Sequence, residues 1–262
     1  MHGEIPLMTS KQQLSKGKVV ITGASSGIGK ALALELSKQG YQLGLVARRM
    51  DVLNDVKRDI LNHVENAPSI DVAVLDVADD ETIYPVLESL SSSMGGLDIV
   101  IANAGITAVN RTGTGNFEKD KRVIQVNLIG GMATVDAAAK IFRASGGGHI
   151  VGISSVSAWM GIPGSSAYSS SKAGFTNYLK AVRTELRKKG IQVTTIHPGF
   201  IATDIAEGME KKPFVINADK AAKDIVKAII KKKDSATIPA FPWSAVTKLL
   251  TVLPEKWVSK TL

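Results

Sequence analysis

The sequence predicts one α/β domain built on a doubly wound parallel sheet of about seven strands with helices on both faces. Short runs rich in valine, isoleucine and leucine alternate with longer segments of helical periodicity along most of the 262 residues. The short runs are apolar at nearly every position, which is typical of strands covered on both faces. No linker of biased composition interrupts this alternation, so we expect a single domain.

The strands are predicted where short β-branched runs end at glycine or polar residues. These runs span residues 18–22, 42–47, 70–75, 97–102, 149–153, 191–196 and 236–238. The helices are predicted where apolar residues recur every three or four positions. These segments span residues 28–39, 50–64, 81–92, 117–144, 166–189 and 218–232. Gly40 and Gly190 mark the ends of two helices.

The main domain is expected to cover residues 18–240, between an N-terminal extension (1–17) and a C-terminal tail (241–262). The tail combines the aromatic residues Phe241, Trp243 and Trp257 with three lysines. It could pack as a lid or an oligomer contact, or it could lie on a membrane surface. We favour the lid or the oligomer contact over the membrane.

Composition excludes several classes of function. The chain has no cysteine, which rules out disulfides, thiolate metal sites and cysteine nucleophiles, and we predict no metal site. The net charge of +8 gathers in lysine clusters at 188–189, 211–212 and 231–233, which we interpret as solvated helix ends. No nucleic-acid motif accompanies this charge. Without a signal-peptide pattern or a long apolar run, a cytoplasmic location is expected.

A glycine-rich turn, Thr22–Gly29, follows the first predicted strand and opens the first helix. Glycines there allow the backbone to approach a pyrophosphate, which the free N–H groups of the helix can bind. The spacing is G-x-x-x-G-x-G rather than the common G-x-G-x-x-G. The expected phosphate contacts are Gly23, Ser25, Ser26, Gly27, Ile28 and Gly29.

The second strand indicates which dinucleotide is bound. It ends in Arg48 and Arg49 rather than in the carboxylate that would bind the adenosine ribose of NAD. Because a guanidinium matches the geometry of a 2′-phosphate, the sequence favours NADP(H). Asp76 and Val77 follow the third strand, where Asp76 could meet the adenine edge or cap a turn.

Six motifs in order resemble the short-chain dehydrogenase/reductase family over about residues 17–240. They are the glycine turn 22–29, Asn103-Ala104-Gly105, Asn127, Ser155 thirteen residues before Tyr168, the pair Tyr168 and Lys172, and Pro198-Gly199 with Thr203. The resemblance implies a Rossmann fold and an exchange between a carbonyl and an alcohol that uses a nicotinamide cofactor. It also implies further cofactor contacts from Asn103, Ala104, Gly105, Tyr168, Lys172, Pro198, Gly199, Ile201 and Thr203.

The residue types suit this chemistry. The phenol of Tyr168 has an ordinary pKa of about 10, and Lys172 lies one helical turn later on the same face. We expect the ammonium to lower the pKa of Tyr168 so that it can act as the acid and base. The resemblance implies that Ser155 donates to the substrate oxygen, that Lys172 also binds the nicotinamide ribose, and that Asn127 holds a water.

Three residues close to these motifs in the sequence have alternative interpretations. Ser154 competes with Ser155, but the thirteen-residue separation selects Ser155. We expect His197 to line the cofactor cleft without a catalytic role, and Asn103 to tie neighbouring strands together.

The predicted substrate contacts are Ser155, Trp159, Tyr168 and Phe200. Other apolar residues of the same segments are Met160, Ile162, Ile201, Met209, Phe214, Phe241 and Trp243. An apolar and aromatic lining favours a hydrophobic ketone or alcohol, although the same residues could simply pack a lid.

Three functions remain open. The leading one is an NADPH-dependent carbonyl reductase acting on a small molecule. The alternatives are an enzyme similar to a 3-oxoacyl-[acyl-carrier-protein] reductase, and a non-catalytic NADP-binding sensor or scaffold. The resemblance also implies a homodimer or homotetramer, formed through the helices of 117–144 and 166–189.

Overall fold

The computed structural model describes residues 15–203 and 214–250. The strands are β1 (Lys18–Thr22), β2 (Gln42–Ala47), β3 (Ile70–Val74), β4 (Ile99–Ala102), β5 (Gly148–Ile153), β6 (Ile191–Pro198), β7 (Ile201–Ala202), β8 (Ile216–Asn217) and β9 (Ser235–Ile238). The α-helices are α1 (Gly27–Lys38), α2 (Met50–His63), α3 (Asp80–Ser93), α4 (Phe117–Ile124), α5 (Gly130–Ser145), α6 (Ser166–Leu186), α7 (Ala218–Ile230) and α8 (Trp243–Leu250).

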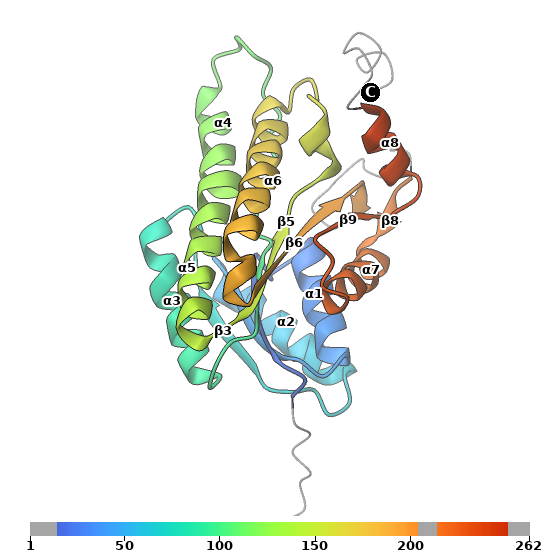
Figure 1. Cartoon of the computed structure of the whole chain (residues 1–262). Coiled ribbons are helices and arrows are strands. Elements are labelled where there is room, and N and C mark those ends of the chain that lie inside the picture. Colours follow the sequence, from blue (N-terminus) through green and yellow to red (C-terminus); the bar gives the residue numbers. More distant parts are fainter. Residues whose placement is uncertain (1–14, 204–213, 251–262) are drawn as a thin grey trace, which may run out of the picture.

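Seven strands form one parallel sheet in the order β3-β2-β1-β4-β5-β6-β9, which confirms the predicted fold class. The strand order reverses direction between β1 and β4, so a crevice is expected at the carboxyl ends of these two strands. Helices α1, α2 and α7 cover one face of the sheet, and α3, α5 and α6 cover the other (Figure 1). Each face has its own buried apolar core.

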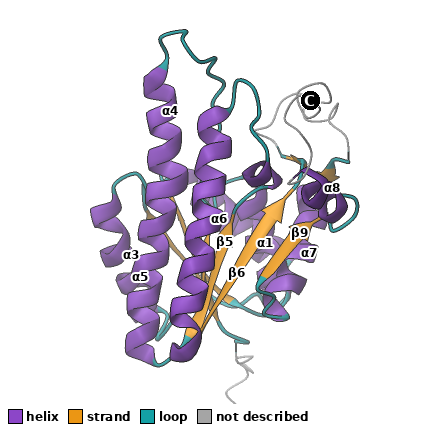
Figure 2. Cartoon of the chain, turned by 45° about the horizontal axis from the view of Figure 1, so that its top comes forward, coloured by secondary structure: helices purple, strands orange, loops and turns teal. Residues whose placement is uncertain are grey.

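Helix α6 can lie close to the sheet because a strand residue opposite it has no side chain. A Cβ added at Gly152 of β5 would lie 2.2 Å from Leu179 of α6. Figure 2 shows α4, α5 and α6 standing together along this face of the molecule. This close packing fixes the position of α6 against the sheet. It therefore also sets where the first turns of α6 lie relative to the end of β5.

The predicted helix at 117–144 is not one regular helix. A π-helical turn at Gln125–Ile129 separates α4 from α5, and it contains Asn127. The Asn127 side chain reaches the backbone of Ile106, which a regular helical pattern in the sequence does not reveal. Sequence periodicity also missed the short β7–β8 pair and α8.

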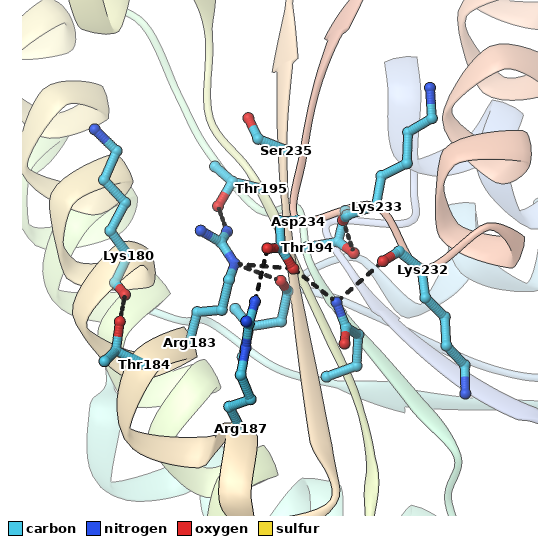
Figure 3. Close-up of polar contacts among 12 residues, drawn as sticks. Lys180, Arg183, Thr184, Arg187, Thr194, Thr195, Lys232, Lys233, Asp234 and Ser235 are labelled. Atoms are coloured by element: carbon cyan, nitrogen blue, oxygen red, sulfur yellow. Dashed lines mark hydrogen bonds and ion pairs between the residues drawn. The ribbon is translucent and has the colours of Figure 1, made fainter.

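Polar contacts hold the carboxyl end of α6 against β6 and the residue before β9 (Figure 3). Arg183 donates to the carbonyl of Val193 at 2.8 Å and to the Thr195 hydroxyl at 2.6 Å. Arg187 donates to Asp234 at 2.8 Å. A hollow of about 520 Å³ beside these arginines lies at the amino ends of the strands, away from the expected crevice. Because both guanidiniums are already bonded, we interpret this cluster as structural.

Two lysine clusters lie where the sequence predicted, at the ends of helices. Lys188 and Lys189 follow α6, and residues 231–233 follow α7, whereas residues 211–212 lie outside the described residues. Among the described helices, none combines the length and apolarity needed to span a bilayer.

Candidate active site

The glycine turn between β1 and α1 has the backbone geometry that a phosphate site requires. Gly23 and Gly27 adopt positive φ angles of 66° and 54°. A Cβ added at Gly29 would lie 2.3 Å from the carbonyl oxygen of Gly23, so any larger residue would displace the turn. Ser26 caps α1 in an extended conformation without a side-chain bond to the helix. The first N–H groups of α1 therefore have no side-chain cap from this residue.

Asn103, at the end of β4, braces this turn. Its side-chain amide donates to the carbonyls of Thr22 at 2.9 Å and Gly23 at 3.2 Å. The backbone N–H groups of Asn103 and Ala104 both donate to the Thr22 hydroxyl. The structural role predicted for Asn103 is confirmed. The part played by the Thr22 hydroxyl was missed, because a threonine at a strand end has no distinctive spacing.

Three arginines lie near the carboxyl ends of β2 and β3. Arg48 and Arg49 follow β2, and the Arg49 guanidinium lies 3.5 Å from the Ser25 hydroxyl. Arg122 of α4 donates to the Asp76 carboxylate at 2.9 Å. The sequence did not single out Arg122, because it lies on a helix distant in the chain and only the fold brings it here.

Asp76 caps a turn, which is one of the two roles that the sequence suggested for it. Its carboxylate accepts from the backbone N–H of Ala78 at 3.1 Å and so caps the turn after β3. Burial alone raises the pKa of Asp76, but the hydrogen bonds from Ala78 and Arg122, with the charges of Arg122 and Arg48, hold it below the ordinary value. Val77 follows in the chain and is buried.

Tyr168 and Lys172 lie on successive turns at the start of α6, as the sequence predicted. Tyr168 forms a side-chain hydrogen bond with Ser155, which lies two residues after the end of β5 and caps the 3-10 turn η2 (Val156–Trp159). Lys172 is only 5% exposed, and its ammonium donates to the carbonyl of Ile153 at 3.0 Å.

The predicted effect of Lys172 on the pKa of Tyr168 is not found. Burial raises the pKa of Tyr168, and the hydrogen bond from Ser155 offsets this only in part. The Lys172 ammonium lies 5.8 Å from the centre of the phenol ring and is bonded to a carbonyl instead. Burial also lowers the pKa of Lys172 to about 8.

The side chains of Asn127 and Lys172 both lie close to Gly105, which has no side chain of its own. A Cβ added at Gly105 would lie 3.2 Å from the Asn127 side-chain oxygen and 3.4 Å from the Lys172 nitrogen. The Asn127 amide is buried and donates to the carbonyl of Ile106 at 2.9 Å and to the Ser171 hydroxyl at 3.2 Å. Its oxygen accepts from the N–H of Ile106 at 2.7 Å. The fold thus brings all four predicted catalytic residues to one place.

The two adjacent serines have different surroundings. Ser154 is turned into the core, where its hydroxyl lies 2.6 Å from Thr176 and donates to the Lys172 carbonyl at 3.1 Å. Only Ser155 is bonded to Tyr168.

Ser155→Ala should therefore lower kcat about 10²- to 10³-fold, as expected for loss of a donor to a developing oxyanion. Ser154→Ala should lower kcat less than about tenfold and destabilise the fold by about 1–2 kcal/mol. Steady-state kinetics and thermal melts of both variants measure this. The reverse order of kcat losses would assign the role to Ser154.

The segment after β6 lies against the glycine turn. Gly199 donates its N–H to the carbonyl of Ile238 at 2.8 Å, and Ile201 is buried in β7. A Cβ added at Gly27 would lie 3.5 Å from Thr203, so Thr203 closes over the turn. Pro198 ends β6 directly before this segment.

Trp159 and Phe200, the two aromatic residues predicted to contact the substrate beside Ser155 and Tyr168, lie in different surroundings. Half-buried Trp159 packs on the His197 ring, whereas Phe200 packs edge-on against Trp243 of α8 with ring centres 5.2 Å apart. Trp243 is buried with Val156 and Met160. Helix α8, in the predicted tail, therefore packs against η2 of its own chain.

The surroundings of Phe241 and His197 differ from those that the sequence suggested. Phe241 is 85% exposed and does not pack with Trp159 or Phe200, so its place in the lining stays a prediction. His197 is 2% exposed and enclosed by neighbouring side chains, so it does not line an open cleft. Met209 and Trp257 lie outside the described residues.

Comparison with known proteins agrees with this arrangement. The family model for short chain dehydrogenases matches residues 17–213. The chain is 35% identical over 246 residues to an uncharacterized oxidoreductase of Mycobacterium tuberculosis, covering 93% of this chain and 96% of the relative. It is 32% identical over 197 residues to a 3-oxoacyl-[acyl-carrier-protein] reductase of Synechocystis, covering 75% of this chain and 78% of the relative.

A solved structure shows the same fold. An alcohol dehydrogenase from the archaeon Thermococcus sibiricus, complexed with 5-hydroxy-NADP, superposes with a TM-score of 0.73 at 25% identity. The alignment covers 84% of this chain and 95% of that one. With the matched family model and its relatives, the chain belongs to the short-chain dehydrogenase/reductase family of oxidoreductases.

Proposed function

We propose that the protein is an NADPH-dependent oxidoreductase that interconverts a hydrophobic carbonyl compound and its secondary alcohol. The observation that carries this proposal is the convergence of Ser155, Tyr168, Lys172 and Asn127 beside the glycine turn. A proton donor, an oxygen-binding hydroxyl and a buried cation together suit reduction of a carbonyl group.

The residues present fit a dinucleotide. At Gly23 and Gly29 of the turn an added Cβ would lie less than 3 Å from backbone atoms. The amino end of α1 supplies N–H groups and a positive dipole end for phosphates. Arg48 and Arg49 would hold a 2′-phosphate, in keeping with the 5-hydroxy-NADP bound to the archaeal alcohol dehydrogenase. When bound, the dinucleotide supplies or accepts the hydride.

The chain's own residues would bind the carbonyl and manage the proton. Ser155 and Tyr168 would both donate hydrogen bonds to the substrate oxygen, and Tyr168 would pass it a proton as negative charge develops there. Lys172, whose ammonium donates to the Ile153 carbonyl, would bind the nicotinamide ribose with its remaining protons. The Asn127 oxygen has a second lone pair beyond its bond from Ile106, which can hold a water on the path from Lys172 to solvent.

The lining supports an apolar substrate. Trp159, Met160 and Phe200 lie on segments that follow Ser155 or Gly199, and α8 covers η2 as a lid would. The direct test follows NADPH absorbance with a panel of ketones that includes 2-tetralone and butane-2,3-dione. NADPH binding without turnover of any compound would instead support the non-catalytic sensor.

Arg48→Ala should raise the Kd for NADPH about 10- to 100-fold, the usual worth of one charge-assisted hydrogen bond. The Kd for NADH should change less than about threefold, because NADH has no 2′-phosphate. Fluorescence titration with both nucleotides measures this. Arg58→Ala is the matched control, since Arg58 pairs with Asp55 on the exposed side of α2. Equal losses for both nucleotides would contradict the preference for NADPH.

The relative from Synechocystis supports a second candidate, a reductase of 3-oxoacyl groups attached to a carrier protein. The lysine clusters after α6 and α7 would suit an acidic carrier. Turnover of an acyl group on its carrier, but not of free ketones, would favour this candidate.

We further propose a homodimer or homotetramer formed through α5 and α6. These helices stand side by side on the outer face, where small residues such as Ala173 and Gly174 permit close approach (Figure 2). Light scattering of the purified protein reports the mass directly.

A further inference from the structure

A buried histidine that the proposed chemistry does not use lies beside the substrate loop. His197 is the next-to-last residue of β6, directly before Pro198, and it is 2% exposed. Its Nε2 lies 3.3 Å from the Thr176 hydroxyl, and its Nδ1 lies 3.3 Å from the Ser235 hydroxyl. Partners on α6 and β9 thus fix the plane of the imidazole ring from both sides.

Two further contacts place the imidazole in a buried polar network. His197 also has a backbone hydrogen bond with Ala236 of β9, and the Thr176 hydroxyl lies 2.6 Å from the Ser154 hydroxyl. Burial, with the charges of Lys180 and Arg183, lowers the pKa of His197 to about 3, so the ring is neutral near pH 7.

The face of this fixed ring supports Trp159. The two ring centres lie 4.3 Å apart with an angle of 44° between the planes. Trp159 ends η2, four residues after Ser155, and its indole is only half-buried. Part of the indole is therefore held by the imidazole, and part is left for another molecule to contact.

We propose that His197 is a positioning residue that holds Trp159 as one wall of the substrate site, and that this wall favours carbonyl compounds carrying a ring. A planar ring on the substrate can stack on the free part of a rigid indole, whereas a small acyclic ketone gains little from it. The inference rests on the proposed carbonyl reductase function, which it extends from an apolar substrate to a ring-bearing one.

Three variants separate ring contact from general stability. His197→Phe keeps an aromatic ring against Trp159 and loses the hydrogen bonds. His197→Gln keeps a polar group and loses the ring. His149→Gln is the matched control, because His149 is a second buried histidine, bonded to Thr194 at the other end of the sheet.

The kinetic readout compares 2-tetralone, which has a ring, with butane-2,3-dione, which has none. His197→Gln should raise KM for 2-tetralone about two- to tenfold, the worth of an aromatic pair, while kcat and KM for the dione stay close to wild type. His197→Phe and His149→Gln should keep the wild-type KM values. An unchanged KM for 2-tetralone in His197→Gln, or an equal rise in His149→Gln, would overturn the proposal.

A second readout needs no turnover. The fluorescence of Trp159 is the difference between the wild-type protein and Trp159→Phe, and acrylamide quenching of that difference reports how firmly the indole is held. Quenching should increase in His197→Gln and stay unchanged in His197→Phe and His149→Gln. If wild type reduces no ketone of the panel, the proposed function fails. Unchanged quenching in His197→Gln would separately refute the positioning of Trp159.

Discussion

Tyr168→Phe should lower kcat about 10²- to 10⁴-fold, the range expected when a general acid is removed. The substitution deletes one hydroxyl and keeps the ring, so the packing at the start of α6 is preserved. The hydrogen bond with Ser155 is lost, but none of the residues around the glycine turn is touched. The Kd for NADPH should therefore stay within about threefold of wild type, because one neutral hydrogen bond is worth little beside the phosphate contacts that would hold the dinucleotide.

Tyr178→Phe provides the control for Tyr168→Phe. Tyr178 lies on the same helix, is half-buried, and has a pKa raised by burial and by Asp136 and Glu185. It therefore tests whether removing a phenol from α6 is harmful in itself. Its kcat should match that of wild type. Retained turnover in Tyr168→Phe, measured by NADPH absorbance with the best ketone of the panel, would defeat the assigned role of the tyrosine.

Much of the fold could be predicted because its strands are buried on both faces. Such strands read as nearly continuous apolar runs, and the helices between them as amphipathic segments. All seven strands of the sheet lie within two residues of their predicted bounds. The short pair β7–β8 and helix α8 could not be predicted this way, because two-residue strands have no periodicity and α8 is one of several apolar segments in the tail.

The candidate site was predictable wherever a backbone turn or a helical repeat sets the spacing. The glycine turn and the pair Tyr168 and Lys172 are of this kind. Arg122 and the partners of His197 come from elements distant in the chain, so no spacing relates them to the site. The raised pKa of Tyr168 was missed for another reason: helical spacing places two residues on one face but does not say how deeply they are buried.

The pH dependence of kcat/KM should depend on the buried Lys172. Burial lowers its pKa to about 8, whereas an exposed lysine would keep its charge to a much higher pH. As pH rises through this value, the ammonium that would bind the nicotinamide ribose is lost. Because kcat/KM for NADPH reports the ionisation of the free enzyme, it should be level near neutrality and fall about tenfold per pH unit above pH 8.

The falling limb belongs to Lys172 rather than to the tyrosine, because burial raises the pKa of Tyr168 and keeps the phenol protonated in this range. Lys172→Arg provides the check, since a guanidinium stays charged throughout. Even if this variant turns over slowly, its kcat/KM should show no decline between pH 8 and pH 10, as measured in overlapping buffers of constant ionic strength. A wild-type profile that stays level to pH 9.5, or a limb that persists in Lys172→Arg, would show that the buried ammonium does not govern the reaction.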